Sequence, residues 1–191
     1  MNGTRRSRLS LLSLALAIVS ACASASPVHE VRLTDPARAG EVTLVDLARD
    51  ARLTVLVFFS SHCPCQRAHD ARLVALAERW APRGVALIAV ASEEGFTAAD
   101  AERERAARGY PFPLVVDPEA RLARSVGATF ATHVTIVDHE GRVRFGGAID
   151  SDVVKLHDDA TPYLEDALSA LTSGRAVGET GRPRGCVLRK S

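Results

Sequence analysis

Two cysteines flank a proline, as Cys63-Pro64-Cys65, shortly after an apolar run over residues 54–59. A continuous apolar run of this kind is typical of a strand buried on both faces. Pro64 suits the first position of a helix, because the N–H that it lacks has no partner there. The first turn of a helix presents unpaired N–H groups and the positive end of the helix dipole, which stabilise a thiolate. We therefore expect Cys63 to be a nucleophile, in preference to one half of an inert disulfide.

A thiolate that attacks a disulfide needs a second thiol to complete the exchange, and two cysteines are candidates for it. A Cys63–Cys65 disulfide would close a small ring that is strained and easily reduced. Cys186 lies in a tail over residues 176–191, and it could resolve an intermediate if that tail folds back. The alternative for Cys186 is an unpaired thiol on a loose tail, so the identity of the resolving cysteine stays open.

Three histidines are expected near these thiols. His62 precedes the nucleophile and could steady its thiolate, His69 shares a helix face with Cys65, and His133 lies in a loop that should face Cys63. Thiolates and imidazoles also bind copper or zinc, so Cys63, Cys65, His69 and His133 form an alternative metal site. We otherwise expect no cofactor beyond the redox-active cysteines, since the chain has no phosphate-binding glycine loop.

The hydrophobic pattern predicts the elements that position these residues. Apolar residues recur at helical spacing from Leu73 to Trp80, so the helix that starts at Pro64 buries one face. Strands and helices alternate along the chain, which favours an α/β domain with helices on both faces of a central sheet. The other predicted helices cover residues 97–109, 118–126 and 161–172, and the predicted strands cover residues 54–59, 85–90, 113–116, 134–137 and 142–145.

Residues 1–22 look like a bacterial signal peptide with a lipobox. A basic start at residues 5–8 precedes an apolar stretch over residues 9–19, which is too short to span a bilayer comfortably. Val19-Ser20-Ala21-Cys22 then has the form of a lipobox, in which Cys22 would receive the lipid; ordinary cleavage at residues 23–25 is the alternative. We therefore expect a protein on the periplasmic side of the cell envelope, anchored to the membrane through Cys22, where disulfides can form.

Length and charge limit the remaining possibilities. The chain has 191 residues, which suits one domain with a core of its own. We interpret residues 23–40 as a tether, residues 41–175 as the domain and residues 176–191 as the tail. The formal net charge is +1, so there is no electrostatic reason to expect a nucleic-acid partner.

Three segments carry a family resemblance. Residues 57–69, around the cysteine pair, are similar to the active-site segment of the thioredoxin-like redoxin superfamily, which includes the AhpC/TSA peroxiredoxin branch. Residues 127–150 resemble the second half of that fold, and Gly185-Cys186 resembles the C-terminal Gly-Cys of one redoxin subgroup. The resemblance implies a thioredoxin-like domain with a central mixed sheet over residues 41–175. It also implies that the partner is a protein disulfide or dithiol, or a small peroxide.

Some positions depart from the family pattern. Gln66 stands where the second cysteine of Cys-x-x-Cys belongs, and Thr132 stands where a cis-proline belongs in the substrate loop. Because a cis bond before a residue other than proline is costly, we expect a trans peptide at Thr132. Leu56 and Ser60 replace the proline and threonine that precede the reactive cysteine of peroxiredoxins, although Ser60 could still supply a hydroxyl. We therefore predict an exported thiol-disulfide oxidoreductase, with peroxide reduction, a copper-handling assembly factor and a non-catalytic scaffold as alternatives.

Overall fold

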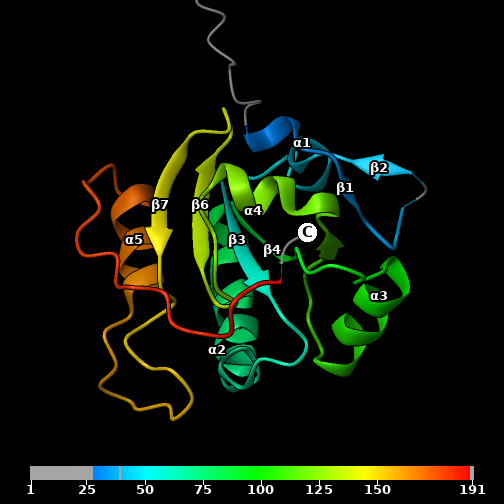
Figure 1. The fold of residues 1–191 in the computed structure, drawn as a ribbon. Helices are drawn as coiled ribbons and strands as arrows, with labels where there is room; N and C mark the ends of the chain where they lie inside the picture. The colour runs from blue at the N-terminus through cyan, green and yellow to red at the C-terminus, as the bar shows by residue number, and fades with distance from the viewer. Residues whose placement is uncertain (1–27, 39, 190–191) are drawn as a thin grey trace, which may run out of the picture.

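A computed structural model describes residues 28–38 and 40–189, and within these residues seven strands form one mixed sheet (Figure 1). The strands are β1 (Leu33–Thr34), β2 (Glu41–Val42), β3 (Leu53–Phe59), β4 (Val85–Ala91), β5 (Leu114–Val116), β6 (Val134–Asp138) and β7 (Val143–Gly147). Their order across the sheet is β2-β1-β5-β4-β3-β6-β7. The three central neighbours β3, β4 and β5 are parallel. Strand β1 pairs antiparallel with β5 and β6 pairs antiparallel with β3, and the edge strands β2 and β7 pair antiparallel with β1 and β6.

Helices cover both faces of the sheet, as the alternation of elements predicts. They are α1 (Leu44–Leu47), α2 (Pro64–Trp80), α3 (Ala98–Ala107), α4 (Arg121–Ser125) and α5 (Tyr163–Thr172), with 3-10 turns η1 (Val28–Glu30), η2 (Ala81–Arg83) and η3 (Pro118–Ala120). Two sequence signals explain where the longer helices start. Pro64 is the first residue of α2, and Thr97 caps α3 in a reciprocal capping box with Asp100.

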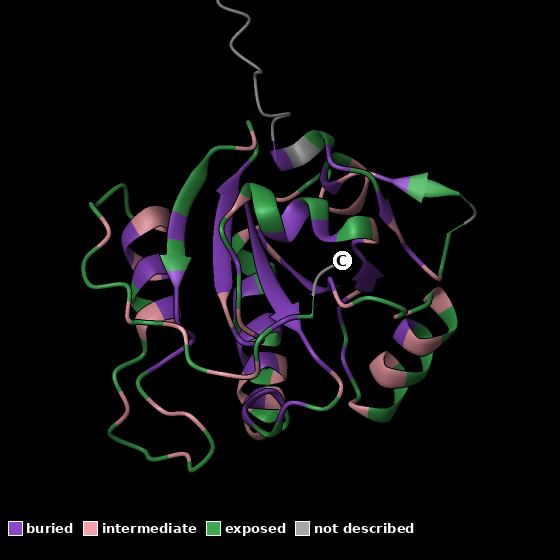
Figure 2. Ribbon diagram, in the orientation of Figure 1, coloured by how far each residue is buried: buried purple, intermediate pink, exposed green. Residues whose placement is uncertain are grey.

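Strand β3 is buried along its whole length because it separates two hydrophobic cores (Figure 2). Val55, Val57 and Phe59 pack in the core that contains α2 and α5. Leu56 and Phe58 point to the opposite core, which contains α4 and the N-terminal segment. Burial on both faces accounts for the continuous apolar run that the sequence shows here.

The N-terminal part of the domain differs from the prediction. Residues 28–38, which we interpreted as part of a tether, contain strand β1 (Leu33–Thr34), which extends the sheet. Leu33 is fully buried, and Thr34 pairs with Val116 of β5. This pairing adds an antiparallel edge to the sheet, so the fold begins before residue 41. The predicted signal peptide and the lipid-attachment residue Cys22 lie outside the described residues.

The helix predicted over residues 118–126 is interrupted. Glu119 and Ala120 have φ values of 56° and 50°, so the chain turns between η3 and α4. Positive φ is uncommon for residues other than glycine, and the sequence pattern gives no sign of it. The other predicted helices and strands begin and end within two residues of their predicted bounds.

The C-terminal tail packs against the domain and crosses it from α5 toward the end of β3, in red in Figure 1. The N–H of Ala148 donates to the carbonyl of Thr180 at 3.0 Å, and Val187 forms an antiparallel bridge with Phe130. This approach needs a glycine, because a Cβ atom on Gly147 would lie 2.0 Å from the Thr180 oxygen. The expectation of a loose tail, our alternative for Cys186, is therefore wrong.

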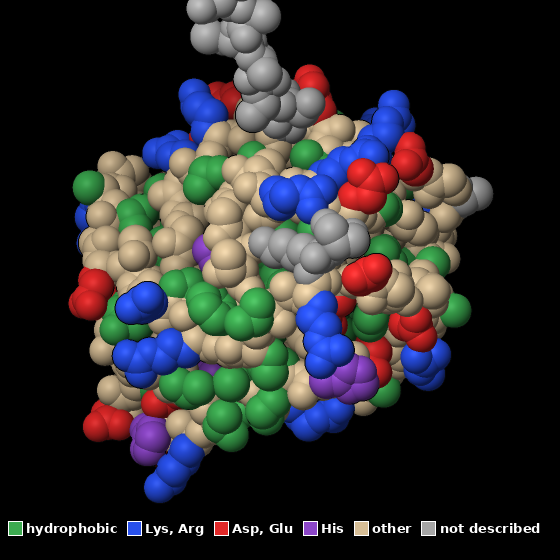
Figure 3. Space-filling view, viewed as in Figure 1, with side chains coloured by type: hydrophobic (Ala, Val, Ile, Leu, Met, Phe, Trp, Pro, Cys, Tyr) green, Lys and Arg blue, Asp and Glu red, His purple; other side chains and the backbone are tan. Residues whose placement is uncertain are grey.

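The surface is mixed in character. Figure 3 shows basic and acidic side chains interspersed over the face that carries the tail, in keeping with the formal net charge of +1. Of the helices within residues 28–38 and 40–189, none combines the length and apolar character needed to cross a bilayer.

Candidate functional site

Cys63 lies at the junction of β3 and α2, as predicted. It is the N-cap residue of α2, with extended backbone (φ −81°, ψ 116°), and Pro64 follows as the first helical residue. The N–H of Cys63 donates to the carbonyl of Ser60 at 3.3 Å and closes the turn that leads into the helix. Cys63 is only 1% exposed, so a partner reaches its sulfur only after a neighbouring segment moves.

The tail carries Cys186 onto this junction. The backbone N–H of Cys186 donates to Sγ of Cys63 across 3.3 Å. Two further hydrogen bonds of 2.9 Å fix this part of the tail, from the N–H of Ala131 to the Cys186 carbonyl and from the N–H of Leu188 to the Thr129 carbonyl. The tail thus folds back onto the expected nucleophile, as a resolving role for Cys186 requires.

Hydrogen bonds lower the pKa of Cys63 even though the thiol is buried. Burial is the largest single influence and raises the pKa of Cys63. It is outweighed by hydrogen bonds from the backbone N–H groups of Cys186, Gln66 and Cys65 together with one from the Cys186 thiol. Each donor stabilises the negative sulfur, so the site favours a thiolate at the helix N-terminus.

Three reduced cysteines meet at this point. The Cys63 thiol influences the pKa of both the Cys65 and the Cys186 thiol, and no disulfide joins the cysteines of the described residues. Burial, followed by the charge of Cys63, raises the pKa of Cys65. The hydrogen bond to Cys63, followed by burial and the charge of Cys63, raises the pKa of Cys186 to about 11. One acidic thiol beside two weakly acidic thiols gives distinct roles to attacking and resolving sulfurs.

Thr132 occupies the position of the expected cis-proline and holds the tail. The described residues contain no cis peptide bond, as we expected for Thr132, whose φ is 68°. Its N–H donates to the carbonyl of Phe58 at 2.8 Å, and its hydroxyl donates to the carbonyl of Arg184 at 3.0 Å. The loop that corresponds to the substrate loop of the family pattern is therefore occupied by the chain's own tail.

The other residues expected near the thiolate have separate contacts. The Ser60 hydroxyl donates to the Glu93 carboxylate at 3.1 Å. His62 is exposed, and the His133 ring packs edge-on against Phe58 with centroids 5.9 Å apart. The hydrogen bonds that lower the pKa of Cys63 thus come from backbone N–H groups and Cys186. We had instead expected His62 to stabilise the Cys63 thiolate.

His69 is buried in a charged pair with Asp150. Its Nδ1 lies 2.7 Å from the carbonyl oxygen of Cys65, and its Nε2 lies 3.0 Å from Oδ1 of Asp150. Arg72 binds the other carboxylate oxygen at 2.6 Å. Because both ring nitrogens face acceptors, the doubly protonated ring is favoured. Burial lowers the pKa of His69, but the bonds to Asp150 and to the Cys65 carbonyl outweigh it and raise that pKa.

These contacts bear on the residues of the alternative metal site. Both ring nitrogens of His69 are engaged, so neither offers a lone pair to a metal. Among residues 28–38 and 40–189, no group of three or more His, Cys, Asp or Glu side chains has the spacing of a metal site. Within the described residues, Cys63, Cys65, His69 and His133 are thus not gathered into a group of metal ligands.

We expect Asp150→Ala to destabilise the protein by about 3 kcal/mol, because it leaves buried His69 without its partner. The pKa of His69 in the folded protein is raised above the ordinary value of about 6.5. The pair's stabilisation is therefore complete below about pH 6.5 and is lost as the pH rises through the folded-state pKa. Urea unfolding from pH 5.5 to 8.5 should show the wild type losing stability with rising pH and the variant losing less. The exposed Asp158→Ala is the control, and equal pH dependence in all three proteins would contradict the assignment.

A buried polar network behind α2 was missed by the sequence analysis. Gln66, at the position expected for a second thiol, donates to the Tyr110 hydroxyl at 3.0 Å, and that hydroxyl donates to Asp70. Arg108 binds Asp70 at 2.8 Å and donates to the carbonyl of Ser61 at 3.0 Å. These partners lie 38 to 47 residues apart, so no local spacing could reveal them. The network fixes the first turns of α2 and the loop before Cys63.

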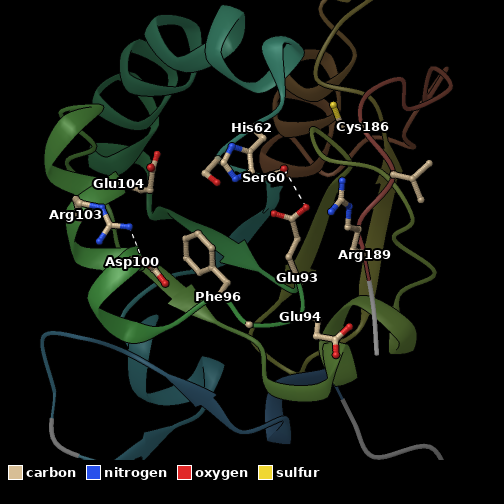
Figure 4. Close-up of a pocket in the computed structure, with 13 residues that line it drawn as sticks. Ser60, His62, Glu93, Glu94, Phe96, Asp100, Arg103, Glu104, Cys186 and Arg189 are labelled. Carbon is tan, nitrogen blue, oxygen red and sulfur yellow. Dashed lines mark hydrogen bonds and ion pairs between the residues drawn. The ribbon is translucent and has the colours of Figure 1, made fainter.

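A surface cavity of about 660 Å³ opens beside Cys186 (Figure 4). It lies between the loop after β4, the start of α3 and the tail. His62, Glu93 and Phe96 line it together with Cys186, whereas Cys63 does not reach it. The cavity gives an outside molecule access to the tail thiol.

A comparison with protein families identifies the class of protein. Residues 26–145, more than half of the chain, match the family described as AhpC/TSA. The chain belongs to the AhpC/TSA family. Membership confirms the resemblance to thioredoxin-like redoxins and gives redoxin-type thiol oxidoreduction as its general chemistry. No curated protein matched the chain.

Solved structures share this fold. An uncharacterised conserved protein from Geobacillus kaustophilus is 28% identical with a TM-score of 0.74, and the match covers 84% of this chain and 88% of that one. A putative thiol:disulfide interchange protein DsbE from Chlorobium tepidum is 21% identical (TM-score 0.56; 74% and 92% covered). A bacterioferritin comigratory protein from Xanthomonas campestris, studied for alkyl peroxide reduction, is 17% identical (TM-score 0.56; 78% and 92% covered). These similarities confirm the predicted thioredoxin-like α/β fold.

Proposed function

We propose that this AhpC/TSA-family protein is an exported thiol-disulfide oxidoreductase in which Cys63 attacks and Cys186 resolves. The observation that supports it most directly is the 3.3 Å hydrogen bond from the N–H of Cys186 to Sγ of Cys63. This contact stabilises the attacking thiolate and holds a second thiol beside it. Cys65, whose pKa is raised by the charge of nearby Cys63, is the second candidate for the resolving role.

The exchange proceeds in two balanced steps. The Cys63 thiolate attacks one sulfur of a partner disulfide, a mixed disulfide forms, and the other partner sulfur leaves as a thiolate. Cys186 loses its proton and attacks Sγ of Cys63, which releases the second partner sulfur. The partner has then gained two electrons, its two thiolates take up one proton from Cys186 and one from solvent, and a Cys63–Cys186 disulfide has formed. The reverse sequence oxidises a partner dithiol.

Peroxide reduction is the second candidate, and family membership favours it. Two positions of the site make peroxide reduction the weaker candidate. The one hydroxyl proton of Ser60, at the position of the family threonine, is donated to Glu93. Leu56, at the position of the family proline, is a fully buried core residue of β3. The site therefore lacks a free hydroxyl donor at Ser60 and the rigid ring of a proline at Leu56.

Alkylation and disulfide mapping test the exchange function. The full chain with Cys22→Ala would be alkylated with iodoacetamide from pH 4 to 10, and modification of Cys63 would be followed by mass spectrometry. We expect reactivity to rise with a midpoint below the ordinary thiol pKa of about 8.5, because the pKa of Cys63 is lowered. Oxidised glutathione should then generate a reversible Cys63–Cys186 disulfide. A midpoint at or above 8.5 with no reversible pairing would sink the proposal.

Export and lipid anchoring are part of the proposal and rest on the sequence of residues 1–22. A lipobox ends in the cysteine that becomes the modified N-terminus, which here is Cys22. Expression in a bacterial host should therefore give a membrane-associated protein whose N-terminal peptide begins at a lipid-modified Cys22. Recovery of a soluble protein that begins at an unmodified residue would contradict the anchor.

A further inference from the structure

The attacking thiolate depends on fewer donors once a partner reaches it. Cys63 is 1% exposed beneath the tail, so attack on an outside disulfide requires the tail to move away. The N–H of Cys186 leaves with the tail, because it belongs to the segment that moves. The N–H groups of Cys65 and Gln66, in the first turn of α2, stay beside the sulfur. In the reactive state, these two helix donors therefore stabilise the thiolate without help from the tail.

The position of the Gln66 N–H depends on the Gln66 side chain. Gln66 is the third residue of α2, and the first N–H groups of a helix have no acceptor within the helix that would hold them. Its side chain is fully buried, and Nε2 donates to the Tyr110 hydroxyl at 3.0 Å. The other amide atom, Oε1, is buried with no hydrogen-bond partner among the described residues. The Tyr110 hydroxyl is thus the one polar anchor that these residues give to the Gln66 amide.

Tyr110 is itself held firmly. It is 2% exposed, and its ring stacks on Phe112 with centroids 4.5 Å apart. Its hydroxyl donates to the Asp70 carboxylate, which also binds Arg108 at 2.8 Å. Because both the ring and the hydroxyl proton are fixed, the Tyr110 oxygen is a rigid acceptor for the Gln66 amide.

We propose that Tyr110 is a positioning residue for the attacking thiol: its hydroxyl anchors the Gln66 side chain and so keeps the Gln66 N–H on the Cys63 sulfur after the tail has moved. This inference rests on the proposed role of Cys63 as the nucleophile. Arg108 binds the same carboxylate as Tyr110 and donates to the carbonyl of Ser61 at 3.0 Å, which extends the support to the loop before Cys63. Tyr110 touches no reacting atom and acts on Cys63 through Gln66.

The Tyr110→Phe variant tests this role, since it removes the hydroxyl and keeps the ring. In the full chain with Cys22→Ala, alkylation of Cys63 by iodoacetamide would be followed from pH 4 to 10 by mass spectrometry. Because the thiolate is less stabilised, we expect the rate at pH 5 to fall about three- to tenfold and the midpoint to rise. The rate well above the midpoint should stay within about twofold. Tyr163→Phe, at the chain's other tyrosine, is the matched control and should leave the profile unchanged.

A second variant separates positioning from a general loss of packing. Gln66→Met keeps the length of the side chain but has no amide, so it should shift the pH profile as Tyr110→Phe does. The double variant should shift the profile no further, because both changes break the same link. An unchanged profile in either variant, with the fold verified by thermal unfolding, or additive shifts would overturn the inference alone. A midpoint at or above about 8.5 before either substitution would overturn the proposed function instead.

Discussion

The Cys63→Ser variant should lose disulfide-reductase activity by about 10³-fold or more, because a serine hydroxyl cannot replace a thiolate as nucleophile. The site is arranged to keep Cys63 charged, with the N–H groups of Cys186, Gln66 and Cys65 directed at its sulfur. The measurement is the reduction of insulin disulfides with dithiothreitol as electron source. Activity near the wild-type level in this variant would support the non-catalytic scaffold instead.

The matched variants Cys65→Ser and Cys186→Ser identify the resolving thiol in the same assay. Loss of Cys186 should leave a mixed disulfide on Cys63 that accumulates with a disulfide peptide and is visible by mass spectrometry. Loss of Cys65 should leave turnover largely intact, because Cys186 still lies against Cys63. The opposite pattern would assign resolution to Cys65 and make Cys186 a structural contact.

A second large effect is expected from Gly185→Ala. This variant should displace the tail and raise the rate of Cys63 alkylation by about 10–100-fold. A Cβ atom at this position would lie 2.3 Å from the backbone oxygen of Ala131. Contacts of Cβ atoms in real proteins are longer than this. Because the clash is between two backbone segments, neither segment can move away as a flexible side chain could. Because the tail covers a thiol that is 1% exposed, its displacement should open the thiol to iodoacetamide.

Gly178→Ala is the control for this experiment. Gly178 lies in the same tail, but no atom lies within 4 Å of the position that its Cβ would take. It should leave the alkylation rate unchanged. Thermal unfolding of both variants would verify that the domain stays folded. If Gly185→Ala and Gly178→Ala behave alike in a folded protein, the tail is not the segment that shields Cys63.

The sequence predicted the parts of this structure that local physical chemistry determines. The apolar run of β3, the proline at the start of α2 and the Thr97 cap of α3 each act within a few residues. These signals place Cys63 at a strand-to-helix junction without knowledge of the rest of the chain. The alternation of elements then limits the fold to an α/β sheet covered on both faces.

The surroundings of the site could not be predicted in this way. Cys186 meets Cys63 across 123 residues, and His69 meets Asp150 across 81. The path of the tail depends on close backbone approaches that only glycine permits, such as Gly147 against Thr180. Such contacts depend on the three-dimensional path of the chain and leave no periodic pattern in the sequence. The hydrogen bond from the Thr132 hydroxyl to the tail is also a long-range contact that the sequence pattern does not reveal.

The span between the two sulfurs also connects catalysis to folding. A disulfide between Cys63 and Cys186, which are 123 residues apart, would close a loop through most of the domain. Restricting the unfolded chain over such a span contributes about 4–5 kcal/mol to stability. The proposed oxidised form is then more stable against unfolding than the reduced form. Each turnover therefore changes the free energy of unfolding of the whole domain. By thermodynamic linkage, contacts that keep the two sulfurs adjacent lower the reduction potential of the pair and favour the disulfide. The N–H groups that stabilise the Cys63 thiolate raise that potential and favour the reduced form.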